Sequence, residues 1–142
     1  MIVLIDSVND TRLEVIKDDP IRPTIPKDFR IAKNRFVSVL ETVDIDAVLC
    51  VNLLDHVPVD TKDLGDCQIG SIAVFYSIWS YRPGSAAKLL TGTVAEIQQR
   101  HPAVNRFITL SPKTEMARRF HLKNGAVVLQ ENPNSVNYEY KF

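Results

Sequence analysis

The stretch Ser71-Ile-Ala-Val-Phe-Tyr-Ser-Ile-Trp79 is rich in apolar, β-branched and aromatic residues, which predicts a buried strand. The turn Ser80-Tyr-Arg-Pro-Gly84 follows it. From Ser85 to about Arg100 the period changes, because apolar residues recur at intervals of three and four. That spacing predicts an amphipathic helix with one apolar stripe, which His101-Pro102 ends. The other predicted elements are arranged around this strand, turn and helix.

Strands are predicted on both sides of this unit. Before it, apolar runs predict strands at 36–40 and 47–54, which form an antiparallel meander with 71–79. The elements predicted after it are a short strand at 106–110, a helix at 114–124 ended by Gly125 at its C′ position, and strands at 126–129 and 136–140. This order predicts an α+β (mixed α/β) fold with a mostly antiparallel, splayed central sheet flanked by helices.

The N-terminal region and one later segment have less regular patterns. Residues 2–5 and 13–16 predict two short strands around a polar turn. Residues 18–34 predict an irregular or short-helical crossing, because the segment contains Pro20, Pro23 and Pro26. Residues 58–70, rich in Asp, Thr and Gly, predict a mobile loop.

Length and composition restrict the class of protein. With 142 residues, 45% of them hydrophobic and 24% charged, the chain is expected to form one domain over 1–142, in which 1–34 lead into a core at 35–142. Basic and acidic residues number 17 each, so no net basic field favours nucleic acid or anionic lipid, although a local patch stays open. No apolar run has the length of a membrane span, and Met1-Ile-Val-Leu-Ile5 lacks a basic flank. We expect a soluble, cytoplasmic protein.

The cysteines and two of the histidines have no pattern typical of a metal site. Cys50 and Cys67 lie in or beside apolar segments, which favours reduced, buried thiols over a disulfide. His56 is beside a loop and His101 is at a helix end. Because the histidines are scattered, we expect no bound metal.

The junction between the central strand and its helix has the features of an anion site. Small residues at Gly84, Ser85, Ala86 and Ala87 leave backbone N–H groups open at a helix start, where the helix dipole favours negative charge. Arg82 would add a charge-assisted contact. Alternatively, Pro-Gly only makes a turn and the small residues allow close packing.

Ser111, His121 and Tyr140 can transfer protons and lie at predicted element boundaries. Near a helix C-terminus the dipole favours an imidazolium at His121, although a core or surface histidine is the alternative. Nine residues separate Ser111 from His121, so one continuous helix would hold them about 15 Å apart. A direct contact requires an irregular helix start, and the alternative role of Ser111 is an N-cap with Pro112 at N1. Tyr138 and Tyr140 are expected on opposite faces of the last strand.

Two of these segments resemble a known superfamily. The segments 82–90 and 117–126 resemble the GNAT acyl-CoA-dependent acetyltransferases. This resemblance implies that the backbone of Gly84 to Ala87 binds the pyrophosphate of coenzyme A. Arg82 precedes Gly84 by two positions where the family pattern has three, so the resemblance carries over the backbone contacts of Gly84 to Ala87 and not the exact phosphate contact of Arg82.

Four blocks in order resemble more specifically the C-terminal, GNAT-fold domain of malonyl-CoA decarboxylase. They are 73–78, 107–112, 120–126 and 137–140. The resemblance implies that Ser111, His121 and Tyr140 are the catalytic serine, histidine and tyrosine. The chain departs from the family in lacking its helical N-terminal domain, part of its phosphate loop and its helical insertion between the serine and histidine motifs.

The resemblance implies an enzyme that acts on a small acyl-CoA thioester, acetyl-CoA or malonyl-CoA, without a metal. The thioester would cross the splayed strands around Ser77 and Thr109. Decarboxylation of a malonyl group would leave an enolate, with its oxygen bound by backbone N–H groups near Ser77, Ile78 and Trp79. His121, helped by Ser111 or Tyr140, would protonate the carbon.

Two other functions stay open. One is transfer of an acetyl group to an amine, with an acidic residue of 58–70 as the base. The other is a non-catalytic acyl-CoA-binding protein. Exposed edge strands would allow a homodimer.

Overall fold

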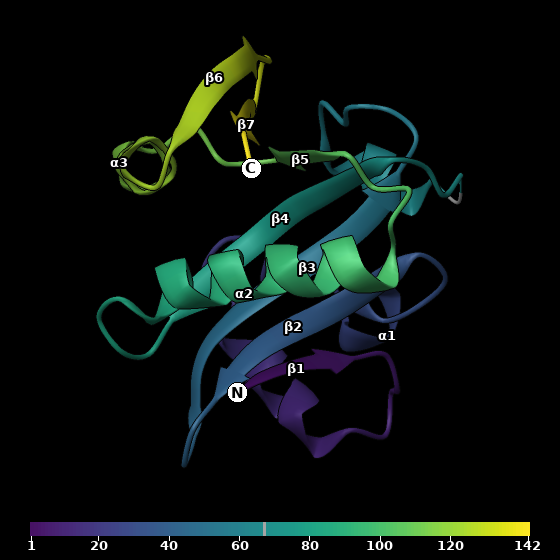
Figure 1. The fold of residues 1–142 in the computed structure, drawn as a ribbon, viewed down its shortest axis with the longest axis vertical. Helices are drawn as coiled ribbons and strands as arrows, with labels where there is room; N and C mark the ends of the chain where they lie inside the picture. Colours follow the sequence, from purple (N-terminus) through teal and green to yellow (C-terminus); the bar gives the residue numbers. More distant parts are fainter. Residues whose placement is uncertain (67) are drawn as a thin grey trace.

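The framework of the protein is a seven-stranded sheet with the order β1-β2-β3-β4-β5-β7-β6 (Figure 1). The structure is a computed structural model that describes residues 1–66 and 68–142, so the prediction for Cys67 lies outside the described residues. The strands are β1 (Ile2–Ile5), β2 (Arg35–Glu41), β3 (Ile45–Leu54), β4 (Ile72–Ser80), β5 (Arg106–Thr109), β6 (Ala126–Glu131) and β7 (Val136–Tyr140). Their arrangement confirms the predicted mixed α/β fold.

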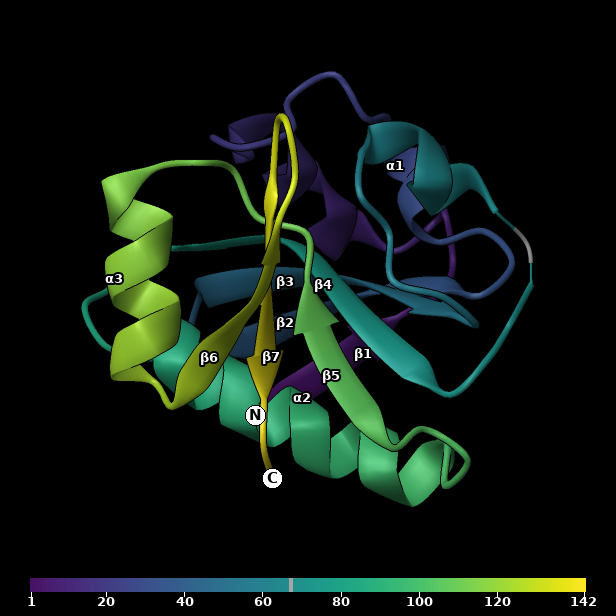
Figure 2. The same cartoon turned by 90° about the horizontal axis from the view of Figure 1, so that it is seen from above.

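Helices cover both faces of this sheet. The amphipathic helix α2 (Ser85–Arg100) lies across β2, β3 and β4 in Figure 1, with Leu89, Leu90, Val94 and Ile97 buried. Figure 2 shows the N-terminal segment and α1 (Lys27–Arg30) on the opposite side of the sheet, and α3 (Glu115–Lys123) beside β6. The sheet therefore has an apolar core on each face.

The strand pairing changes in the middle of the sheet. β2, β3 and β4 form the predicted antiparallel meander, whereas β4 pairs parallel with β5. That parallel pairing ends at Phe75 and Thr109, although β4 continues to Ser80. The pairing of β4 with β3 shifts register between Cys50 and Val51, opposite Phe75 and Ser77. The sheet is therefore splayed and bulged at the same point.

One prediction about the connecting segments is wrong, and another is incomplete. Residues 13–16 are not a strand but part of the 3₁₀ helix η1 (Thr11–Asp18), whose buried residues Leu13 and Ile16 are three positions apart and so share one face. Segment 58–70 is not simply a loop, because it contains the 3₁₀ helix η2 (Thr61–Gly65). A capping box of Asp60 and Asp63 fixes η2, and Leu64 is fully buried.

The sheet ends at β1 on one side and β6 on the other. The edge strand β6 exposes Val127, Val128 and Leu129. A homodimer stays a prediction.

Among the described residues, no helix combines the length and apolar character needed to cross a bilayer.

Candidate functional site

A cavity of about 600 Å³ occupies the splay between β4 and β5. The end of β4, the start of α2, residues 110–112 and one face of α3 form its walls, and Pro20 and Ile21 close the far side. Most of the lining surface is apolar. The predicted site residues that line it are Ser77, Ile78, Trp79, Ala86, Ser111 and His121.

The predicted serine, histidine and tyrosine form one continuous chain of hydrogen bonds. Ser111 Oγ lies 3.2 Å from His121 Nε2, and His121 Nδ1 lies 2.7 Å from the Tyr140 hydroxyl. Ser111 Oγ also donates to Thr109 Oγ1 over 2.7 Å. All four side chains are buried. The tertiary structure thus brings together three residues that come from different elements.

The contact between Ser111 and His121 is possible because α3 begins late. Thr114, not Ser111, is the N-cap, and its hydroxyl accepts the N–H of Ala117. Ser111 instead pairs with Val136 in a single β-bridge. The alternative role of Ser111 as an N-cap is therefore wrong. Its extended backbone supplies the irregular start that the direct contact requires.

His121 is neutral in this environment. Burial lowers its pKa to about 4, so the imidazolium expected from the helix dipole does not persist at neutral pH. Since the Ser111 hydroxyl donates to Thr109, the hydrogen-bond pattern assigns the imidazole proton to Nε2. Nδ1 then accepts from the Tyr140 hydroxyl, whose pKa burial raises. Each hydrogen bond of the chain therefore has its donor on the Tyr140 side and its acceptor on the Thr109 side.

Tyr138 and Tyr140 lie on the same face of β7, so the prediction of opposite faces is wrong. Residues two positions apart on a strand share a face. The Tyr138 ring stacks on the His121 ring with centroids 5.0 Å apart, and the Tyr140 ring meets it edge-on at 5.8 Å. Tyr138 therefore packs against the imidazole, while Tyr140 hydrogen-bonds to it.

The backbone of β4 directs one particular N–H group into the splay. The Tyr81 N–H donates to the carbonyl of Asp46 in β3, so the Tyr81 N–H faces β3. Because hydrogen-bonding directions alternate along an antiparallel pair, Trp79 and Ser77 also face β3 and Ile78 faces the splay. Of the three predicted backbone donors, the geometry selects the N–H of Ile78.

Only one residue of the predicted phosphate loop, Ala86, lines the cavity. Gly84 has φ of 80°, the Ser85 N–H donates to Arg82 C=O at 3.2 Å, and no side chain caps the first turn of α2, so an anion at this turn would meet the N–H groups of Ala86 and Ala87. Ala86 lines the cavity, whereas Gly84, Ser85 and Ala87 lie outside its walls. Arg82 pairs with Asp46 at 3.3 Å and its side chain is largely exposed.

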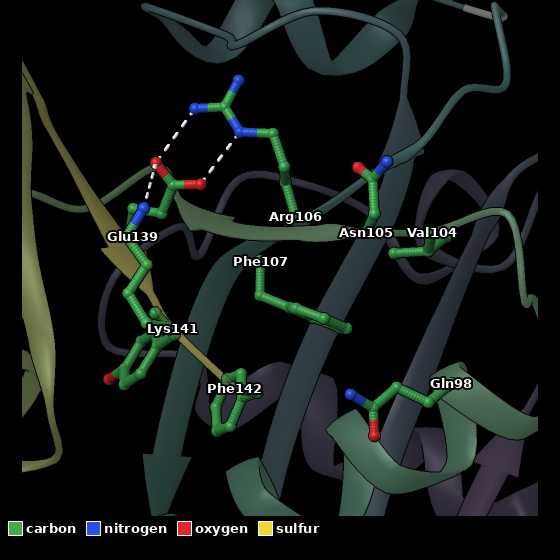
Figure 3. Close-up of a pocket in the computed structure, with 9 residues that line it drawn as sticks. Gln98, Val104, Asn105, Arg106, Phe107, Glu139, Lys141 and Phe142 are labelled. Carbon is green, nitrogen blue, oxygen red and sulfur yellow. Dashed lines mark hydrogen bonds and ion pairs between the residues drawn. The ribbon is translucent and has the colours of Figure 1, made fainter.

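A second cavity, of about 460 Å³, lies between α2 and the strands β5 and β7 (Figure 3). Arg106 and Glu139 form a two-bond ion pair above it, with both bonds 2.9 Å long. The Phe107 side chain extends downward from β5 in Figure 3, the Phe142 ring lies below it, and both residues line the cavity. Tyr140 also lines this cavity, so the chain of hydrogen bonds begins beside one cavity and ends in the other.

Hydrogen bonds that the sequence analysis did not predict support the site. Asn137 is fully buried and donates to the carbonyls of Pro58 and Thr109, which fastens the segment before η2 to β5. Thr109 Oγ1 accepts the N–H of Tyr138 as well as the Ser111 hydroxyl. The sequence resemblance predicts Thr109 beside the thioester, but no sequence signal points to these hydrogen bonds of Thr109 and Asn137.

His56, Asp63 and Asp66 form a group whose ligand atoms lie within 4.8 Å of one another. Hydrogen bonding to Asp55, with the nearby Asp66 and Asp63, raises the pKa of His56, whose two ring nitrogens lie 2.7 Å from Asp55 and 2.9 Å from Asp66. The group lies outside the lining of the cavity between β4 and β5.

No protein-family model and no curated protein sequence matches the chain. Solved structures do match it. A malonyl-CoA decarboxylase from Agrobacterium vitis matches with a TM-score of 0.71 and 23% identity over 84% of this chain. The chain spans only 35% of that protein.

Two shorter structures match over their whole length. One, from Desulfovibrio desulfuricans, is described as a GNAT-family acetyltransferase, with a TM-score of 0.65, 9% identity and 99% of each chain covered. The other is the PaiA N-acetyltransferase from Thermoplasma acidophilum in complex with coenzyme A, with a TM-score of 0.68, 10% identity and coverage of 100% of this chain and 99% of that one.

At these identities the matches establish the fold. The chain has the GNAT fold, as the sequence segments predicted. Among its structural neighbours are malonyl-CoA decarboxylases as well as acetyltransferases.

Proposed function

We propose that the protein is an acyl-CoA enzyme that decarboxylates a malonyl thioester. The observation that carries this proposal is the chain Ser111–His121–Tyr140, which reaches the wall of the cavity between β4 and β5. Its neutral donors suit protonation of a carbanion. The bound thioester would cross this splay, with its pyrophosphate at the open first turn of α2.

The walls of the cavity favour loss of carbon dioxide. Its lining is mostly apolar and includes no aspartate or glutamate among the described residues. The described lining includes no lysine or arginine, so a malonyl carboxylate placed there loses hydration without gaining a cationic partner, and breaking the bond to carbon dioxide removes that charge. The bonding electrons pass into the thioester, whose oxygen becomes an enolate that the N–H of Ile78 binds.

The proton then returns to carbon along the chain of hydrogen bonds. The Ser111 hydroxyl turns from Thr109 to the enolate carbon and gives up its proton, His121 Nε2 replaces it, and Nδ1 takes the proton of Tyr140. One proton from solvent then returns Tyr140 to its hydroxyl form, and the imidazole proton returns from Nδ1 to Nε2 before the next turnover. The net result is a thioester shortened by carbon dioxide, with one proton consumed.

Acetyl transfer to an amine, which the shared fold also allows, has less support. An ammonium acceptor needs a base to remove its proton. The acidic residues of 58–70, which are Asp60, Asp63 and Asp66, lie outside the lining of the cavity. They interact with His56 or cap η2 instead.

The test is incubation with malonyl-CoA, with acetyl-CoA and free thiol measured separately. Decarboxylation yields acetyl-CoA and releases no thiol, whereas acetyl transfer to an added amine releases the thiol of coenzyme A. The variant Ser111→Ala should lose activity while retaining its affinity for coenzyme A. Protein that binds coenzyme A but produces no acetyl-CoA would refute the decarboxylase function.

A further inference from the structure

Where β4 and β5 separate, the carbonyls of Tyr76 and Leu110 lack the hydrogen-bond partner that a neighbouring strand would supply. The last hydrogen bond between the two strands runs from Leu110 N–H to Phe75 C=O, at 2.9 Å. The register shift in β4 directs the next carbonyl, that of Tyr76, to the same side. Buried carbonyls require partners, because each one left unpaired destabilises the fold.

Arg22 supplies the partner for both carbonyls. Its Nε donates to Tyr76 C=O at 2.8 Å, and its Nη2 donates to Leu110 C=O at 2.7 Å. A guanidinium is planar, so its two donors hold their acceptors at a set spacing. Arg22 does not itself line the cavity, whereas Tyr76 and Leu110 both do. It therefore acts on the site through these two residues.

Buried polar contacts fix the backbone that carries Arg22. Asp19 Oδ1 accepts the N–H groups of Ile21 and Arg22, at 2.7 and 3.0 Å. The fully buried Arg30 donates to Asp19 Oδ2 at 2.6 Å and to the Arg22 carbonyl at 2.7 Å. Asp18 accepts the hydroxyl of Tyr81, which follows β4. We call residues 18–30 the strap.

We propose that Arg22 is a positioning residue that sets the separation of β4 and β5, and that the strap exists to place it there. The strap then determines how the Ile78 N–H and the Ser111 hydroxyl are spaced across the cavity. This assignment deepens the proposed function and rests on it for the consequences at the thioester. The role of Arg22 in holding the two strands does not depend on which reaction occurs.

Hydrogen exchange measured by mass spectrometry tests the structural role. In Arg22→Ala, amides in 74–80 and 107–112 should exchange about tenfold faster, while β2 and the middle of α2 keep their protection. Arg12→Ala is the matched control, because Arg12 of η1 makes a similar two-bond pair with Glu41 at the end of β2, away from β4 and β5. Ethylguanidinium at millimolar concentration should restore protection in Arg22→Ala, and ethylammonium should not. Unchanged exchange in 74–80 and 107–112 would overturn the proposal.

Calorimetry with coenzyme A and acetyl-CoA tests the consequence at the site. Arg22→Ala should weaken binding of acetyl-CoA about tenfold or more but that of coenzyme A by less than about threefold, since only the thioester end lies in the splay. Equal losses for both ligands would overturn the positioning role. If the unaltered protein bound neither ligand, the proposed function would fail, and hydrogen exchange would still decide the role of Arg22. If Arg22→Ala does not fold, Arg22→Lys replaces it, because lysine keeps the charge but lacks the two spaced donors of the guanidinium. Amides in 74–80 and 107–112 should then exchange at an intermediate rate. Exchange as slow as in the unaltered protein would refute the proposal.

Discussion

The Tyr140 hydroxyl lies 2.7 Å from Nδ1 of His121, on the opposite side of the imidazole from the Ser111 hydroxyl. The two contacts use both ring nitrogens, which fixes the orientation and the tautomer of the ring. Because Tyr140 is also a wall of the second cavity, the imidazole connects two separate regions of the protein.

Replacing Tyr140 with Phe should reduce turnover of the acyl-CoA substrate about a hundredfold, because Nδ1 loses its proton donor. The ring contact with Phe142 should remain, so binding of coenzyme A should change little. Steady-state kinetics and calorimetry measure the two effects. Tyr138→Phe is the control, since the ring of Tyr138 stacks on His121 but its hydroxyl is not part of the chain. Equal losses in the two variants would contradict the role of Tyr140.

The pKa of His121 predicts a pH dependence of stability. The folded-state pKa is about 4, below the value near 6.5 of an exposed histidine, so the unfolded chain binds more protons between these values. The free energy of unfolding should therefore fall as pH is lowered through this window, by about 2 kcal/mol between pH 7 and pH 5 from this group. Urea unfolding at both pH values measures it. His121→Gln should lose this part of the slope; an unchanged slope would argue against a buried neutral imidazole.

Thr109→Val should both destabilise the protein and redirect Ser111. The substitution removes the acceptor of the Tyr138 N–H, which costs about 1–3 kcal/mol. The Ser111 hydroxyl is then left with His121 Nε2 as its acceptor, which requires the other imidazole tautomer. Nitrogen-15 NMR of His121 reports the tautomer, and thermal unfolding reports the stability. Thr109→Ser keeps the acceptor and should leave both readouts near those of the unaltered protein.

A negative charge at the start of α2 should weaken the binding of coenzyme A without lowering the stability of the fold. In Ala87→Glu, the carboxylate interacts favourably with the helix dipole, so stability should be unchanged or slightly higher. The same charge repels a pyrophosphate at that turn, so affinity for coenzyme A should fall, and added salt should narrow the difference. Calorimetry at two salt concentrations measures both changes. Gln98→Glu, near the other end of α2, is the control; similar losses in both variants would contradict the placement of the pyrophosphate.

Asp19→Asn should destabilise the strap strongly. Burial alone would raise the pKa of Asp19, but hydrogen bonds from Arg22, Arg30 and Ile21 lower it, so the group is a carboxylate in the folded protein. Removing its charge leaves Arg30 buried without a counter-ion, which costs about 3–5 kcal/mol. Chemical denaturation measures the loss. Asp10→Asn breaks a partly exposed pair and should cost far less.

Local patterns in the sequence predicted most elements of the fold. The apolar run at 71–79, the three- and four-residue period after Ser85, and Gly125 after the second helix correspond to β4, α2 and the end of α3. These signals depend on neighbouring residues only. The error at 13–16 has the same origin, because four apolar and charged residues do not distinguish a strand from a 3₁₀ turn whose burial is set by the sheet beneath it.

The sequence by itself determined the order of the elements, the residues able to transfer protons and the small-residue start of α2. Only the tertiary structure decided that Ser111, His121 and Tyr140 touch, that His121 is neutral, and that Arg22 bridges Tyr76 and Leu110. Each of these features depends on residues from different elements meeting in a buried place. Desolvation and hydrogen-bond geometry arise from that meeting, and no local period or motif encodes them.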